Sequence, residues 1–198
     1  SNHFVAEGVQ KNKYVETLSE LTSSVELYNA LVGQRKYDAA IGILADRLWH
    51  SMMYRFAATK QLSDLLLMVY PHGTETVSLA ESDRLKWITD RFLAHSLHRL
   101  GQLQQALPLY RRTIQSSFNT EERSDTLDKL ADAERIAGEY FNSEQSSLQS
   151  LKIYRSLGDI RGEGIALWRL GLVYAILGAE IASFVSLQRS MRIFESVR

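Results

Sequence analysis

The chain has 198 residues, of which 45% are hydrophobic, and its 23 Lys and Arg residues balance 23 Asp and Glu residues. This length can bury a sizeable core in one domain, and the absence of net charge excludes a broad electrostatic footprint for nucleic acid or an anionic membrane. With no cysteine, disulfides, thiol catalysis and thiolate zinc sites are excluded, which is compatible with a cytoplasmic location. No apolar stretch is long enough to predict a membrane span.

The first part of the sequence has helical periodicity. Apolar residues recur at three- and four-residue steps and predict a helix over 11–32. The pattern resumes after Gly33 over 37–48, and further helices are expected over 49–58 and 61–70. Pro71 and Gly73 then end the helical pattern, because the residue before a proline is biased away from helix. The polar stretch 74–83 is therefore predicted to be a loop.

A recurring pattern organises the second part. Its members are Leu93-Ala94, Gly101, Ala106 and Tyr110, then Leu130-Ala131, Gly138 and Tyr140, then Leu170-Gly171, Tyr174 and Gly178. The glycines are 37 residues (101 to 138) and 40 residues (138 to 178) apart, as in two-helix repeats such as the tetratricopeptide (TPR) unit. We predict first helices of each pair over 84–100, 122–137 and 162–177. Gly101 and Gly178 are expected to end two of these helices, because a positive φ is favourable for glycine. Leu93 and Leu170 should be buried between paired helices.

The expected fold is therefore an all-α, TPR-like α-solenoid of about five antiparallel helix pairs, a right-handed superhelix, in one domain over 1–198. Repeats of this kind stack on one another and form an extended concave surface suited to binding. Residues 1–3 have the character of an expression-tag remnant, and the helical pattern is still present at 191–194. We therefore expect the chain to be a fragment of a larger protein.

Several runs have a more specific character than the general repeat. They are Leu27-Tyr28, Tyr37-Asp38, Asp46-Arg47-Leu48, Tyr54-Arg55, Tyr70-Pro71, Gly101-Gln102, Pro108-Leu109-Tyr110 and Gly158-Asp159. Together they resemble the TPR region that follows the nucleotide-binding module of bacterial STAND-type signalling ATPases, relatives of NACHT and NB-ARC receptors. Ala57 and Ala58 stand where that resemblance leads us to expect a glycine. The resemblance implies a sensor or scaffold segment whose ATPase chemistry lies elsewhere.

No catalytic motif is found in the sequence. It has no phosphate-binding Gly-x-x-x-x-Gly-Lys-Ser/Thr loop, no nucleophile elbow and no His-Glu-x-x-His helix. We therefore expect the chain not to be an enzyme and to use neither cofactor nor metal. His95 and His98 lie three residues apart on one helix, but without matching ligands they are interpreted as ordinary exposed histidines.

The resemblance also predicts a ligand-binding groove, because the first helix of each TPR unit lines the concave face. The residues placed there are Arg91, His95, His98 and Arg99, then Asp128, Asp132 and Arg135, then Trp168. Arg91 and Arg99 would clamp a carboxylate or phosphate, and Trp168 would be an aromatic anchor. Alternatively, Arg91 and His95 pair with Asp128 and Asp132 as salt bridges between repeats.

Two functions remain open. The first is a protein- or peptide-binding module with its partner on the concave face. The second is a small-molecule inducer-binding domain, as in certain ATP-dependent bacterial transcription regulators that carry similar repeats. An enclosed pocket would favour the small molecule, and an open groove would favour a protein segment. The sequence does not specify the oligomeric state.

Overall fold

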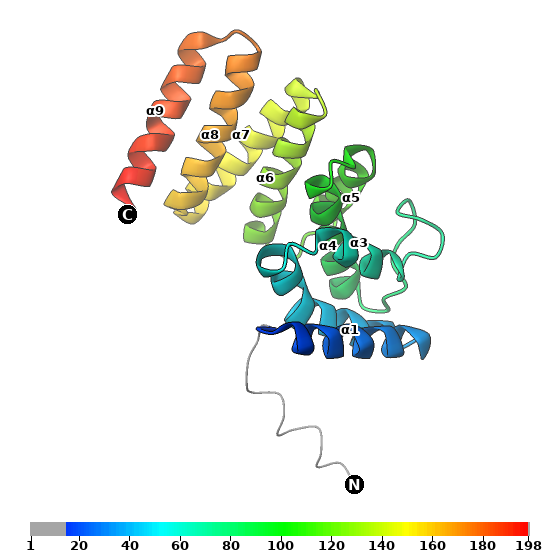
Figure 1. Cartoon of the computed structure of the whole chain (residues 1–198). Helices are drawn as coiled ribbons and strands as arrows, with labels where there is room; N and C mark the ends of the chain where they lie inside the picture. Colours follow the sequence, from blue (N-terminus) through cyan, green and yellow to red (C-terminus); the bar gives the residue numbers. More distant parts are fainter. Residues whose placement is uncertain (1–14, 198) are drawn as a thin grey trace. The chain divides into compact units, whose positions relative to one another are not determined.

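The computed structural model describes residues 15–197, and within that range every regular element is a helix (Figure 1). The all-α prediction is confirmed. The chain divides between Ser96 and Leu97 into two compact units. Residues 1–3, predicted to be a tag remnant, and residues 11–14 of the first predicted helix lie outside the described range.

In the first unit, α1 (Leu18–Gly33) starts at a capping box. The Thr17 hydroxyl accepts from the Glu20 N–H (3.2 Å), and the Glu20 carboxylate accepts from the Thr17 N–H (3.4 Å). These reciprocal bonds satisfy amides that the first helical turn leaves unpaired. They fix the start of α1 at residue 18, several residues later than the apolar periodicity predicts.

The next helix corrects a predicted boundary. α2 (Tyr37–Ile43) continues through two π-helical stretches, η1 (Leu44–Leu48) and η2 (Ser51–Arg55), so no break occurs at Trp49. α3 (Thr59–Leu67) begins two residues after Ala57, which has an unusual positive φ of +50°. A positive φ suits glycine best, which explains why a glycine is expected near this position.

Two tyrosine hydroxyls tie the first unit together. Tyr28 of α1 is fully buried and donates to the Leu65 carbonyl of α3 (2.7 Å). Tyr70, which follows α3, donates to the Asp90 carboxylate of α4 (2.5 Å). Residues 68–82 between α3 and α4 contain no helix, in agreement with the predicted loop.

α4 (Asp83–Arg99) runs from the first unit into the second, and five helices follow it. They are α5 (Leu103–Gln115), α6 (Thr120–Ile136), α7 (Tyr140–Leu157), α8 (Ile160–Ile176) and α9 (Glu180–Ser196). Each of the first four of these packs against the next in the chain. The predicted helices over 84–100, 122–137 and 162–177 are confirmed to within two residues. Gly101 and Gly178 have φ of 75° and 73° in the turns between helices, as predicted, and Gly138 has a φ of 83° in the turn after α6.

Serines line the contacts within two of the helix pairs. The Ser143 hydroxyl of α7 donates to the Ala131 carbonyl of α6 (2.6 Å), and 40 residues later Ser183 of α9 donates to the Gly171 carbonyl of α8 (2.8 Å). Small side chains let the paired helices approach closely, and the hydroxyls find backbone acceptors. The two pairs are therefore equivalent units of a helical repeat.

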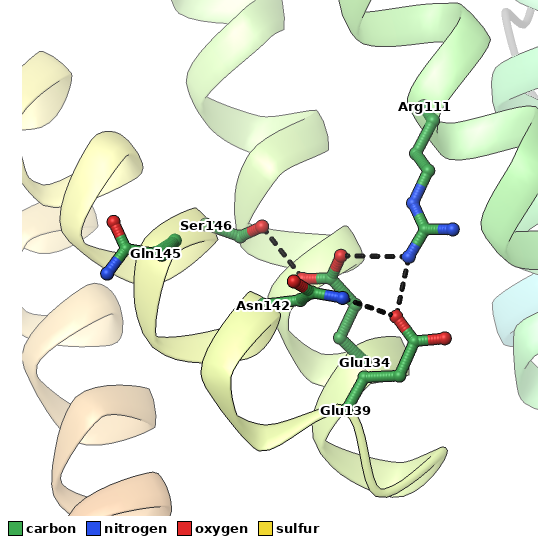
Figure 2. Close-up of a pocket in the computed structure, with 6 residues that line it drawn as sticks. All are labelled: Arg111, Glu134, Glu139, Asn142, Gln145 and Ser146. Atoms are coloured by element: carbon green, nitrogen blue, oxygen red, sulfur yellow. Dashed lines mark hydrogen bonds and ion pairs between the residues drawn. The ribbon is translucent and has the colours of Figure 1, made fainter.

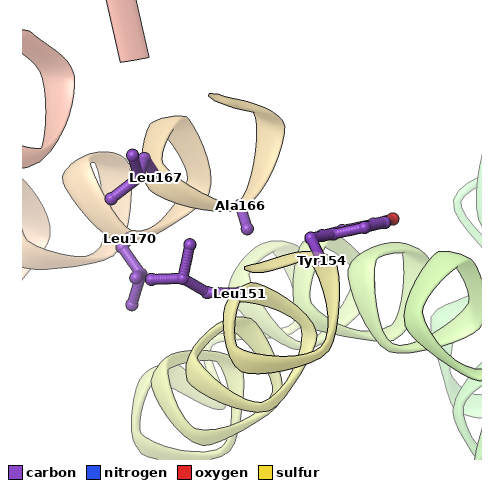
Figure 3. Packing of buried hydrophobic residues seen from close by; sticks show 5 residues of the cluster. All are labelled: Leu151, Tyr154, Ala166, Leu167 and Leu170. Carbon is purple, nitrogen blue, oxygen red and sulfur yellow. The ribbon is translucent and has the colours of Figure 1, made fainter. Parts of the chain in front are cut away.

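A hydrophobic cluster of the second unit lies between α7 and α8. It contains Leu151 and Tyr154 of α7 with Ala166, Leu167 and Leu170 of α8 (Figure 3). Gly162 of α8 packs against the Tyr154 ring so closely that a Cβ there would lie 2.3 Å from a ring carbon. Leu170 is 2% exposed, and Leu93 of the first unit is fully buried, so both burial predictions are confirmed.

Candidate functional site

Charged side chains join α6 to α8 inside the second unit. The Arg169 guanidinium of α8 donates through Nε to Asp128 Oδ1 (2.5 Å) and through Nη2 to Asp128 Oδ2 (3.1 Å). Its Nη1 lies 2.7 Å from Asp132 Oδ1. Asp128 is 1% exposed and Arg169 is 7% exposed. This is a two-point pair removed from water, a geometry that only arginine offers to a carboxylate.

Asp132 is the centre of the network. It accepts from Arg135 Nη2 (2.9 Å) one turn along α6, and its Oδ2 lies 3.7 Å from His98 Nε2 of α4. Burial alone would raise the pKa of Asp132, but the guanidinium groups of Arg169 and Arg135 outweigh it, so the pKa lies below its usual value. The carboxylate is therefore ionised at neutral pH.

His98 occupies the end of this network that lies on α4. Burial lowers the pKa of His98, and the attraction of Asp132 only partly offsets this effect. Its Nδ1 lies 3.3 Å from the Tyr110 hydroxyl of α5. The imidazole is therefore neutral near pH 7, and it contacts the Tyr110 hydroxyl rather than completing a strong ion pair.

The lowered pKa of His98 predicts a pH dependence of stability. The unfolded chain binds a proton at this side chain near its ordinary pKa of 6.5, whereas the folded chain binds it only at lower pH. We expect the free energy of unfolding to fall as pH decreases below about 6.5, and this part of the fall to be absent from His98→Gln. Urea denaturation from pH 7.5 to 5.5 measures it. A fall in His98→Gln that is as steep as in the native sequence, or steeper, would contradict the prediction.

The structure brings together four of the eight predicted groove residues. His98, Asp128, Asp132 and Arg135 belong to the network just described. Arg91 instead has its guanidinium carbon 5.0 Å from the centroid of the Trp87 ring, and His95 has its ring 5.6 Å from that of Trp49.

Arg91 and His95 belong to the first unit, whereas His98 and the exposed Arg99 belong to the second, although all four are on α4.

Sequence reasoning missed Arg169, the residue that binds both Asp128 and Asp132 of α6. A signal for it exists, because Arg169 is the one charged residue between Glu163 and Glu180. An isolated charge inside an apolar helical stretch needs a buried partner of opposite sign. Asp128 and Asp132, one turn apart on the first helix of the preceding repeat, supply that partner.

Trp168 lies beside the network and remains 44% exposed, with its ring centroid 5.7 Å from the Arg169 guanidinium carbon. It shares one side of α8 with other residues that are partly or fully exposed, namely Ile165, Leu172 and Ala175. The neighbouring side of α6 carries Asp125, Lys129 and Asp132. We call this combined surface the α6–α8 face. It places an apolar stripe with an aromatic residue next to a charged stripe.

A second polar cluster lies among α5, α6 and α7 (Figure 2). Arg111 of α5 bridges Glu134 of α6 (3.4 Å) and Glu139 in the following turn (2.6 Å). Ser146 of α7 donates to Glu134 (2.7 Å), yet burial keeps the pKa of Glu134 above its usual value. A hydrogen bond from Asn142 is the main cause that lowers the pKa of Glu139.

The cavity at this cluster has a volume of about 430 Å³ and is open to solvent. The carboxylates of Glu134 and Glu139 are already bound by Arg111, Ser146 and Asn142. The cluster therefore serves to connect three helices. Within residues 15–197, no three His, Asp or Glu side chains are grouped so that they could hold a metal ion.

No protein-family model matches the chain. No curated protein is significantly similar to it. Among solved structures, it is similar to that of BtubC (BKLC) from P. vanneervenii, with a TM-score of 0.62, 16% sequence identity, and coverage of 91% of this chain and 73% of that one. At this identity the likeness shows the all-helical fold alone. None of the helices in the described range is long and apolar enough to span a membrane.

Proposed function

We propose that this chain is a TPR-like solenoid module that binds a protein or peptide segment on its α6–α8 face. The exposed Trp168, set between the apolar stripe of α8 and the charged stripe of α6, is the observation that carries the proposal. Tryptophan and arginine are enriched among residues that dominate binding energy, and charged side chains around them favour a particular register of the bound segment.

The repeat arrangement supports a TPR-like solenoid. Leu130-Ala131 and Leu170-Gly171 occupy equivalent places in two consecutive helix pairs, and both pairs end their first helix at a glycine of positive φ. On the sequence resemblance we further propose that the module is a cytoplasmic sensor segment of a STAND-type ATPase and acts by binding, without catalysis of its own.

A protein segment suits this surface better than a small molecule. Small-molecule sites are mostly enclosed and apolar, with a few convergent polar groups. The cavity at Arg111 is open to solvent and lined by charged and amide side chains. The α6–α8 face is a surface with alternating apolar and charged stripes, which fits an extended or helical peptide.

Peptide display against the purified chain tests the proposed function. Fluorescence anisotropy of the selected peptides should show that Trp168→Ala weakens binding by at least about tenfold, because an aromatic anchor contributes on the order of 2 kcal/mol. Phe141→Ala is the matched control, since Phe141 of α7 is an exposed aromatic residue away from this face. Equal affinity of the native chain and Trp168→Ala for every selected peptide would refute the proposal. Saturable binding of a small apolar ligand, in the absence of any selected peptide, would favour the alternative function.

A further inference from the structure

α9 carries large apolar side chains that no described residue covers. Ile181 is 83% exposed, Phe184 is 65% exposed and Met191 is 62% exposed. The side of α9 that contacts α8 contains Ser183, Ser186 and Ser190, which are buried. Leu187, Ile193 and Phe194 of α9 pack toward α8, whereas Ile181, Phe184 and Met191 lie on other sides of the helix and stay exposed.

The repeat shows what covers the equivalent surface one unit earlier. Because Ser143 and Ser183 make the same hydrogen bond 40 residues apart, each residue of α7 corresponds to the residue of α9 numbered 40 higher. Leu151 of α7 is 5% exposed because α8 packs on it (Figure 3), and its equivalent is Met191. Glu144 of α7 lies against Tyr174 of α8, and its equivalent is Phe184.

Not every exposed apolar residue of α9 belongs to this surface. Ile181 corresponds to Phe141, which remains 71% exposed on α7 even though α8 packs along that helix. Phe141 therefore lies outside the contact between consecutive repeats. Phe184 and Met191 lie at positions that a following helix would cover, and we call the surface around these two side chains the α9 face.

We propose that the α9 face docks an amphipathic helix whose contact stripe has the chemistry of α8. In α8 that stripe consists of Gly162, Ala166 and Leu170, with small residues where the helices approach closely and a leucine that fills the core. The same kind of stripe fits Met191, because methionine adapts its shape to an apolar neighbour. The continuation of an existing helix-on-helix interface thus defines the partner.

Charge adds a second requirement for the partner. Arg155 at the end of α7 donates from Nε to the Glu163 carboxylate of α8 (2.8 Å). The residue of α9 equivalent to Arg155 is Glu195, so the sign is reversed. The docked helix should accordingly carry a basic residue at the place of Glu163. This inference is independent of the proposed function, since it uses neither Trp168 nor the α6–α8 face.

A labelled peptide provides the test. The probe has the sequence of residues 160–176 with Glu163→Lys, and its fluorescence anisotropy is measured against the whole chain. We expect saturable binding that weakens at least about tenfold in Phe184→Glu and in Met191→Glu, because a charge buried against an apolar stripe is strongly unfavourable. Phe141→Glu, the matched control, should bind as the native chain does, and so should Trp168→Ala.

The charge requirement is tested by exchange. The Glu195→Lys variant should prefer the unmodified peptide over the Glu163→Lys peptide, the reverse of the native chain. Melting curves of Phe184→Glu and Met191→Glu should match that of the native chain, because both side chains are exposed. Absence of saturable binding would overturn the inference, as would equal weakening by Phe141→Glu. Light scattering that shows a dimer dissociated by Met191→Glu would assign the α9 face to a second copy and would also overturn it.

Discussion

Replacing Arg169 with methionine is expected to lower the free energy of unfolding by about 3–5 kcal/mol, because breaking a buried ion pair from one side leaves the other charge uncompensated. Asp128 is 1% exposed and accepts two hydrogen bonds from Arg169, whereas its other cationic neighbour, Lys129, has its Nζ 3.6 Å from Asp128 Oδ2. Methionine approximates the length of the arginine stem. The loss of stability would therefore come mainly from the Asp128 carboxylate left without its guanidinium partner, and less from a cavity. Urea denaturation followed by circular dichroism at pH 7 measures it.

The double variant Arg169→Met with Asp128→Asn is the matched control. It removes the stranded charge, so the double variant should be more stable than Arg169→Met alone, even though it lacks the ion pair. A loss below about 1 kcal/mol in Arg169→Met would place the pair among ordinary surface salt bridges. A double variant that is no more stable than the single one would show that lost packing, and not the charge on Asp128, causes the loss.

The helices of the second unit could be predicted from the sequence because glycines mark the turns in which they end. A residue with φ near +75° is favourable only for glycine among the common residues, and the turns at Gly101, Gly138 and Gly178 all require it. The spacing of these glycines therefore predicts the helix ends as well as the repeat. Apolar periodicity alone predicts helix boundaries less accurately, since α1 starts at Leu18 and not at residue 11.

The helix around Trp49 could not be predicted in the same way. π-helical stretches at Leu44–Leu48 and Ser51–Arg55 add a residue to the turn, so the apolar pattern no longer follows the α-helical period. The predicted helices over 37–48 and 49–58 therefore have a boundary at Trp49 that the structure lacks. In the structure the backbone remains helical from 37 to 55, and the shift only changes which side is buried.

The candidate site was predictable in part. The TPR resemblance, with Leu93-Ala94, Leu130-Ala131 and Leu170-Gly171 taken as equivalent positions, places His98, Asp128, Asp132 and Arg135 on corresponding sides of successive first helices. Which charges pair depends on how far one helix is displaced along its neighbour, and spacing within a helix does not contain that information. Arg169 was missed for this reason, since the same phase that exposes Trp168 buries the next residue against α6.

Leu170→Ala is expected to destabilise the chain by about 2–5 kcal/mol, through the loss of buried methyl groups and the cavity that remains. Leu170 is 2% exposed and lies in the cluster between α7 and α8, where Figure 3 shows it directed toward Leu151. Leu177→Ala is the matched control, because Leu177 is 50% exposed just after α8 and surface changes stay within about 0.5 kcal/mol. Chemical denaturation compares the two variants.

A double-mutant cycle with Leu151→Ala extends this prediction to the contact between repeats. Because Leu151 and Leu170 belong to one cluster on two consecutive repeats, truncating both should cost less than the sum of the single losses, with a coupling of about 0.5–3 kcal/mol. The second truncation enlarges a cavity whose contacts the first has already removed. Strictly additive losses would mean that each leucine packs within its own helix pair, and an unchanged denaturation midpoint for Leu170→Ala would contradict the repeat register itself.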